Sequence, residues 1–334
     1  MMRLLAGATL LLFAAASSAQ GGDFVRPLSA IERAPITQDM LGRLFGTPGF
    51  ARLERPVTVA AQGNLVYLFD AGPNLFYRYD NNQKTLQELS NITGALKGAA
   101  AGITVAPDRS FYVADPAGHQ VIHSSFDGQV LRLLRDEANL ANPVATALDT
   151  LGNNLLVADS LFDHIVGFNQ QGWLLFGFGQ RGMGPQQFQL IVDMARGPQG
   201  LYVVDRLNPF IKIFTPEGKF IFGFTRREVA NPSAIAVDRY ERVYIADSFD
   251  DTIKVYVKGQ LAGEIGGTGS TLGRFRFITD LCIEQNTLYV ADSMNGRIQV
   301  FEIDPPAVKK PQPQTSITLP PLDTPSPTNG VPEL

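Results

Sequence analysis

Short hydrophobic segments alternate with polar turn residues along most of this chain, and one version of the pattern occurs six times. Alternation over five or six residues predicts a half-buried β-strand. Each of the six segments ends in aspartate, and successive aspartates are 42 to 46 residues apart. A repeat of about 40 to 50 residues is the length of one β-propeller blade. The segments are LVYLFD (65–70), SFYVAD (110–115), NLLVAD (154–159), GLYVVD (200–205), RVYIAD (242–247) and TLYVAD (287–292).

Each repeat divides into predicted strands separated by short polar turns. In the fifth repeat the four strands are SAIAVD (233–238), RVYIAD (242–247), TIKVYV (252–257) and QLAGEIG (260–266). The predicted fold is therefore all-β, a six-bladed β-propeller of four-stranded antiparallel blades. We expect the blades near residues 56–89, 102–134, 143–179, 190–224, 232–266 and 277–303.

The sixth repeat lacks a fourth strand, because prolines and a polar segment follow IQVFEI (298–303). The segment MLGRLFG (40–46), which precedes the first repeat, is similar to the fourth strands of other repeats. We therefore predict that this N-terminal segment completes the last blade and closes the ring. Closure would remove the exposed sheet edges that favour aggregation.

The connections between several repeats resemble those of a known family. The resemblance is to NHL repeats, extends over residues 40–303, and rests on FGTPGFARLERPVTVA, FGQRGMGPQQFQLIVDMA and IGGTGSTLGRFRFITDLCI, and on the later LYVADSMNGRIQVF. It implies a six-bladed propeller. NHL propellers serve as binding platforms, as sensor domains and in a few cases as enzymes, so the resemblance leaves the function open.

The two ends of the chain differ in composition from the repeats. Residues 1–19 have a basic start, an apolar stretch and small residues at the end, which predicts a signal peptide and export to the periplasm or the medium. The apolar stretch is too short for a stable membrane insertion. The propeller is expected to occupy residues 20–304. The tail, 305–334, is rich in Pro, Ser and Thr and is predicted to be disordered.

Composition argues against several kinds of function. The formal net charge is −4, so we expect no nucleic-acid partner. Three histidines and the single cysteine, Cys282, do not suggest a zinc site with its usual three or four ligands. No spacing typical of a catalytic nucleophile and its base is visible, so no catalytic residue is assigned.

The six repeated aspartates are predicted to be structural turn caps rather than metal ligands. Each ends a strand and begins a tight turn, where a carboxylate can accept hydrogen bonds from backbone N–H groups two residues on. Because the aspartate recurs in every blade, we expect it to stabilise the fold rather than to form part of a single binding site. The residues are Asp70, Asp115, Asp159, Asp205, Asp247 and Asp292.

Two further aspartates are candidate ligands in the central channel. Asp193 and Asp280 each lie twelve residues before the repeated aspartate of their blade, at the start of an inner strand. They could help to hold Ca²⁺, which takes oxygen ligands. They lie in the fourth and sixth blades, so we expect the channel to separate them. The alternative is that each pairs with a nearby backbone N–H or arginine.

A third feature is a group of arginines in the connections that lead from one blade to the next. These connections share one face of a propeller, and arginine clusters favour carboxylate- or phosphate-rich partners. The alternative is ordinary solvated charge. The residues predicted to bind a partner are Arg181, Arg226, Arg227, Arg274 and Arg276.

Two functions remain open after the sequence is read. The complete propeller and the missing catalytic constellation favour an exported, non-catalytic scaffold that binds a protein or anionic ligand on the loops. The resemblance also allows a metal-dependent lactonase- or lyase-like enzyme with its site in the channel. In that case Asp193 and Asp280 are the candidate ligands.

Overall fold

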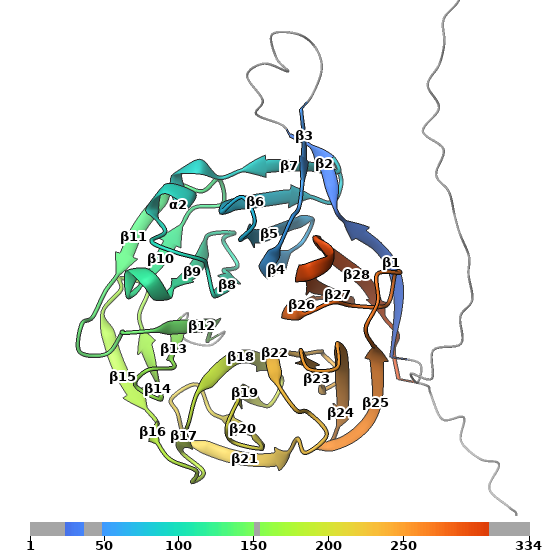
Figure 1. Ribbon diagram of the computed structural model, residues 1–334. Helices are drawn as coiled ribbons and strands as arrows, with labels where there is room; N and C mark the ends of the chain where they lie inside the picture. Colours follow the sequence, from blue (N-terminus) through green and yellow to red (C-terminus); the bar gives the residue numbers. More distant parts are fainter. Residues whose placement is uncertain (1–23, 37–48, 150–153, 307–334) are drawn as a thin grey trace, which may run out of the picture. The chain divides into compact units, whose positions relative to one another are not determined.

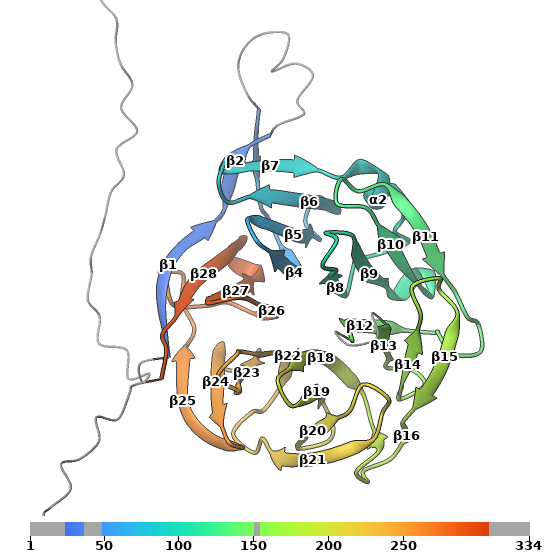
Figure 2. The same ribbon diagram turned by 180° about the vertical axis from the view of Figure 1, so that it is seen from behind.

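The computed structural model describes residues 24–36, 49–149 and 154–306. Within them, six four-stranded antiparallel sheets are arranged as blades around a central channel (Figure 1). The predicted fold class is therefore confirmed. The strands of each blade run in sequence order from the channel outwards, except in the last blade, and Figure 2 shows the six inner strands around the centre.

The strand boundaries follow the six repeats closely. Blades one to three consist of β4 (Pro56–Gln62), β5 (Leu65–Asp70), β6 (Leu75–Asp80) and β7 (Thr85–Glu88); β8 (Gly102–Val105), β9 (Phe111–Asp115), β10 (Gln120–Ser124) and β11 (Val130–Leu134); and β12 (Pro143–Leu148), β13 (Leu155–Asp159), β14 (His164–Phe168) and β15 (Leu174–Phe178). Blades four to six consist of β18 (Ile191–Gly197), β19 (Gly200–Asp205), β20 (Phe210–Phe214) and β21 (Phe220–Thr225); β22 (Pro232–Val237), β23 (Arg242–Asp247), β24 (Thr252–Val257) and β25 (Gln260–Gly266); and β26 (Ile278–Glu284), β27 (Thr287–Asp292), β28 (Arg297–Ile303) and β1 (Val25–Ile31).

An N-terminal strand does close the ring, but it is not the strand that the sequence suggested. β1 pairs with β28 from Val25 opposite Ile303 to Ile31 opposite Ile298. The outer position of the last blade is thus taken, and the assignment of residues 40–46 to it is wrong. Those residues lie outside the described part of the chain. β1 escaped notice because Pro27, at a bulge, interrupts its alternation, and an edge strand tolerates proline.

The hydrophobic core lies between the blades rather than in one central mass. The second strand of each blade is almost entirely buried, whereas the outer strands are largely exposed or half-buried. Each cluster of buried side chains combines neighbouring blades, as where Tyr244 of the fifth blade joins Phe301 of the sixth and Phe275 of the connection between them. Face-to-face packing of this kind holds the inner strands at constant positions around the channel.

Small additional elements decorate the connections. They are the helix α2 (Ser90–Ala95), the 3₁₀ helices η1 (Pro116–Gly118) and η2 (Ser293–Asn295), and the short pairs β2 (Arg33–Pro35) with β3 (Phe50–Arg52) and β16 (Gln180–Arg181) with β17 (Gln187–Phe188). Among the described residues, no helix is long and apolar enough to cross a membrane. The predicted signal peptide, and the predicted tail beyond residue 306, lie outside the described part.

Candidate functional site

The six repeated aspartates are buried, with relative exposures of at most 1%. In the first five blades the carboxylate accepts a hydrogen bond from a backbone N–H two or three residues further along the turn. The donors include Gly72, Gly118, Leu161, Leu207 and Phe249. Asp292 departs from this pattern, because it holds its turn through the side chains of Asn295, Arg297 and Gln299.

The same carboxylates also bind the connection that enters their own blade, which the sequence had not suggested. Asp159 accepts hydrogen bonds at 2.6 Å from the N–H groups of Ala141 and Asn142. The corresponding donors elsewhere are the N–H groups of Glu54 and Arg55, Lys97, Gln189, Ala230 and Asn231, and Arg276. Each aspartate thus ties a turn to a connection. These turns and connections form one face of the ring, which we call the loop face.

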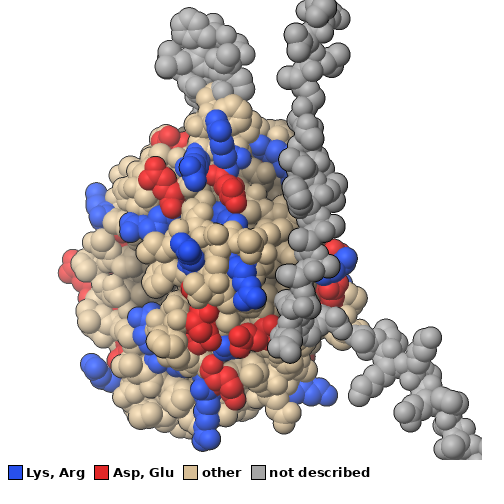
Figure 3. All heavy atoms as spheres, turned by 45° about the vertical axis from the view of Figure 1, so that its right-hand side comes forward, with Lys and Arg blue, Asp and Glu red and all other residues tan. Residues whose placement is uncertain are grey.

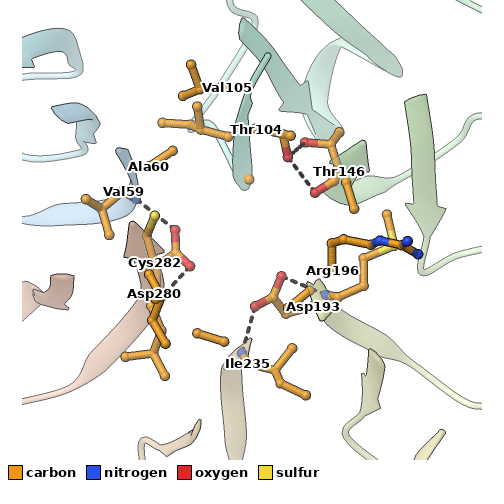
Figure 4. A pocket seen from close by; sticks show the side chains of 18 of the residues that line it. Val59, Ala60, Thr104, Val105, Thr146, Asp193, Arg196, Ile235, Asp280 and Cys282 are labelled. Carbon is orange, nitrogen blue, oxygen red and sulfur yellow. Dashed lines mark hydrogen bonds between the residues drawn. The ribbon is translucent and has the colours of Figure 1, made fainter. Parts of the chain in front are cut away.

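Residues of all six inner strands line a cavity of about 210 Å³ in the channel. Asp193 on β18 and Asp280 on β26 both point into it (Figure 4). Asp193 accepts hydrogen bonds of 2.8 Å from the N–H groups of Met194 and of Ile235 on β22. Its two oxygens therefore join the inner strand of the fourth blade to that of the fifth.

Asp280 repeats this arrangement between the sixth and first blades. It accepts N–H donors from Leu281 and from Val59 on β4, both at 2.8 Å, and the Thr58 hydroxyl at 2.6 Å. Both carboxylates therefore have the backbone N–H partners that the structural alternative required.

Asp193 and Asp280 face the same cavity from the fourth and sixth blades, and burial shifts the pKa of both carboxyl groups. Burial raises the pKa of Asp280 to about 6. Burial, and next the charge of Asp280, raise the pKa of Asp193 well above its ordinary value. The pair therefore holds protons at a higher pH than ordinary carboxyl groups do.

The described residues fit a metal ion poorly. Among them no three His, Cys, Asp or Glu side chains gather in a way that could hold one. Burial raises the pKa of the nearby Cys282 thiol to about 12, and its Sγ accepts the N–H of Ala61 at 3.2 Å. Ca²⁺ needs six to eight oxygen ligands, whereas two carboxylates already bound to N–H groups face this cavity.

One of the five predicted partner-binding arginines does not lie on the surface. The Arg226 side chain is buried, with 4% of its surface exposed, and donates to the carbonyls of Asp205, Arg206, Asn208 and Val229. It satisfies carbonyl groups that the turn would otherwise leave unpaired. Its assignment to a binding surface is therefore corrected.

The other four arginines are exposed on connections of the loop face. Arg181 is 3.8 Å from the Asp163 carboxylate, and Arg274 donates to the Gly266 carbonyl at 2.7 Å. The side chains of Arg227 and Arg276 form neither a hydrogen bond nor an ion pair with any described residue. Basic and acidic side chains alternate over the side of the molecule in Figure 3, without a field of one sign.

The loop face carries an apolar feature that sequence reasoning missed. The second residue after the repeated aspartate is large, apolar and exposed in four successive blades: Leu161 (64%), Leu207 (60%), Phe249 (78%) and Met294 (60%). We call these four residues the apolar arc. The first two blades have Gly72 and Ala117 at this position. In the sequence these turns begin with DSL, DRL, DSF and DSM. The strings show an apolar third residue, but they do not show that its side chain is exposed.

Comparison with known proteins supports the architecture. Residues 275–301 match the model of the NHL repeat. No curated protein sequence matches the chain significantly. Among solved structures, a streptogramin B lyase is similar with a TM-score of 0.57 and 11% identity, covering 75% of this chain and 94% of its own.

Two other solved structures give the same result. A virginiamycin B lyase from Staphylococcus aureus has a TM-score of 0.57 and 11% identity, covering 81% of this chain and 98% of its own. A structural genomics protein of unknown function from Bacteroides thetaiotaomicron has a TM-score of 0.57 and 15% identity, with coverages of 85% and 73%. At such identities the likeness shows a shared fold alone. The chain is thus a six-bladed β-propeller that carries an NHL repeat at residues 275–301, in its last blade.

Proposed function

We propose that this protein is an exported, non-catalytic scaffold that binds a protein partner on its loop face. The apolar arc is the observation that carries the proposal. Large apolar side chains at one turn position in four successive blades form a repeated surface feature, whereas single exposed apolar residues are ordinary. Their outward position leaves them without a role in the core.

The arc is also held rigidly, which favours binding. The N–H groups of Leu161, Leu207 and Phe249 donate to buried carboxylates at 2.9–3.0 Å. A preorganised turn loses little conformational freedom when a partner binds. Full burial of a Leu, Phe or Met side chain contributes about 1.5–3 kcal/mol, so a few arc residues would supply a useful share of an affinity.

The test compares two variants with equal numbers of changes. One replaces Leu161, Leu207, Phe249 and Met294 by Ser. The matched control replaces Leu131, Leu175 and Leu261, which are exposed on the outer strands, and Trp173, which is exposed immediately before β15, by Ser. Tagged full-length protein would be cross-linked in its native host and the partners quantified by mass spectrometry. We expect a partner that the control retains and the arc variant loses. Equal loss from both variants, or no loss from the arc variant, would contradict the proposal.

Export is part of the same proposal and has its own test. The signal peptide predicted at residues 1–19 supports export. Its cleavage after Ala19 would leave Gln20 as the first residue of the exported protein. Cell fractionation and the mass of the intact protein should find the shortened chain in the periplasm or the medium. A full-length chain confined to the cytoplasm would overturn export.

A metal-dependent lactonase- or lyase-like activity in the channel is the second candidate. The observation in its favour is that Asp193 and Asp280 face one cavity. Against it, both carboxylates already accept backbone N–H groups. Metal analysis of the purified protein discriminates, because a stoichiometric ion that is lost in Asp193→Asn would favour the enzyme.

A further inference from the structure

Phe277 extends the apolar surface of the loop face in the last two blades. Its N–H donates to the Asp251 carboxylate at 2.6 Å, and its carbonyl accepts the N–H of Ser293 at 3.3 Å. Asp251 is two residues from Phe249, and Ser293 precedes Met294. The backbone of Phe277 is therefore bonded to the turns of two neighbouring arc residues.

The conformation of Phe277 is unusual for so bulky a residue. Its φ is 59°, in the left-handed region that favours glycine, yet 47% of the side chain is exposed. A strained position that carries a half-exposed aromatic ring is typical of sites selected for contact rather than for stability. Glycine would satisfy the backbone better, so the fold alone does not require the ring.

Three exposed arginines lie beside these apolar residues. Arg206 precedes Leu207, and the Arg276 carbonyl accepts the N–H of Met294 at 3.1 Å. Arg227 follows the buried Arg226, whose guanidinium binds the carbonyls on either side of Leu207. Within the described part of the chain, the Arg206, Arg227 and Arg276 guanidinium groups have no hydrogen-bond or ion-pair partner.

The nearby carboxylates, by contrast, already accept hydrogen bonds from other residues of the chain. Asp250 accepts from Lys254 at 2.7 Å, Glu228 from the Tyr256 hydroxyl at 2.9 Å, and Asp251 from Phe277. The sector formed by blades four to six therefore presents unused cationic donors between apolar side chains. Arginine binds carboxylates in a bidentate geometry, which makes acidic groups the complementary chemistry.

We infer that the partner is a polypeptide segment that carries apolar side chains next to Asp or Glu. Phe249, Phe277 and Met294 bury the apolar side chains, and Arg206, Arg227 and Arg276 pair with the carboxylates. This inference rests on the proposed function, and it specifies the partner and the sector. A polypeptide fits better than a lipid surface. The residues of the apolar arc stand one per blade, separated by polar turn residues that need hydrogen-bond partners.

The probe is a random peptide library displayed on phage and selected on the immobilised, purified full chain. We expect enriched peptides to combine Leu, Phe or Met with neighbouring Asp or Glu. The affinity of one enriched peptide is then measured by calorimetry. Phe277→Gly should weaken it roughly tenfold, while Tm is unchanged or rises because glycine accepts the positive φ.

Charge reversal tests the second half of the inference. Arg227→Glu with Arg276→Glu should weaken the same peptide and reduce the salt dependence of its binding. Arg132→Glu, an exposed residue of the outer strand β11, is the control and should have little effect. Enriched peptides without acidic residues, or peptide binding indifferent to both loop-face variants, would overturn the inferred partner.

The outcomes separate this inference from the function on which it rests. Suppose that the arc variant loses a cross-linked partner, but Phe277→Gly and the charge-reversal variant retain it. The proposed scaffold function then stands, and the inference about the partner's chemistry is overturned. If no peptide is enriched, and phosphatidylglycerol vesicles bind the protein but not Phe277→Gly, the ligand is a lipid surface and the inference fails.

Discussion

A single buried carboxylate organises each blade at the residue scale. Aspartate suits this position because its short side chain accepts several hydrogen bonds and donates none when ionised. Asp159 accepts four backbone N–H groups, two from its own turn and two from the connection that enters the blade. The buried Asp159 therefore holds the turn in which Leu161 is exposed.

Replacement of Asp159 by Ala should lower the free energy of unfolding by about 3 kcal/mol or more, because four backbone donors lose their acceptor and leaving even one unpaired costs about 1–3 kcal/mol. Urea unfolding measures the effect. Asp127→Ala, on an exposed turn, is the control and should change stability by about 0.5 kcal/mol or less. A similar loss in both variants would contradict the anchoring role.

The channel carboxyl groups predict an unusual dependence of stability on pH. The folded pKa of Asp280 is about 6, above the unfolded value, so the folded state binds the proton more tightly. Stability should therefore fall as the pH rises from about 4 to about 6 and then level off, by up to about 3 kcal/mol from this group. Asp280→Asn should flatten this part of the curve, as measured by unfolding at several pH values. If the stability of the wild type instead rises between about pH 4 and pH 6, and that of Asp280→Asn does not, the raised pKa of Asp280 would be contradicted.

Ring closure is decided at the scale of the element. β1 contributes little apolar surface of its own, since most of its residues are exposed and only Ile31 is buried. Its contribution is the ladder with β28, continued by the hydrogen bond from the N–H of Asp304 to the carbonyl of Phe24. Arg26 adds exposed ion pairs with Glu302 and Asp304, which contribute little.

Deletion of residues 24–31 should lower Tm markedly and promote association, because β28 would become an unpaired edge. Thermal unfolding and light scattering measure these effects. The matched control replaces residues 40–46 by a Gly/Ser segment of equal length. We expect a smaller effect there, since β1 already occupies the outer position. A larger effect from replacing residues 40–46 than from deleting residues 24–31 would instead favour residues 40–46 as the closing strand.

Over the whole molecule, charge and apolar surface are distributed unequally. The chain has a net charge of −4, whereas the loop face of blades four to six exposes the guanidinium groups of Arg206, Arg227 and Arg276. The apolar arc spans the third to sixth blades and is absent from the first two. A ring of similar blades thus acquires one distinct side.

Association with the cross-linked partner should weaken as salt is raised, because exposed charges are screened over about 8 Å at physiological ionic strength. Surface plasmon resonance should show the change mainly in the association rate. Changing Arg181, Arg227 and Arg274 together to Glu should slow association without changing Tm appreciably. An association rate independent of both salt and these substitutions would leave the arginines as ordinary solvated charge.

The sequence by itself determined the repeat, the blade boundaries and the position of the repeated aspartates, because alternation and turn chemistry are local. Tertiary structure alone decided the rest. Arg226 and Arg227 are adjacent and identical in type, yet one is buried under carbonyls and the other is exposed. β1 was found only through its pairing with β28, where Ala30 lies opposite Gln299, 269 positions further along the chain. Register is a property of two strands together, so a distant pairing leaves no local pattern. Asp193 and Asp280 share one cavity because the ring returns distant inner strands to a common axis, which no local pattern records.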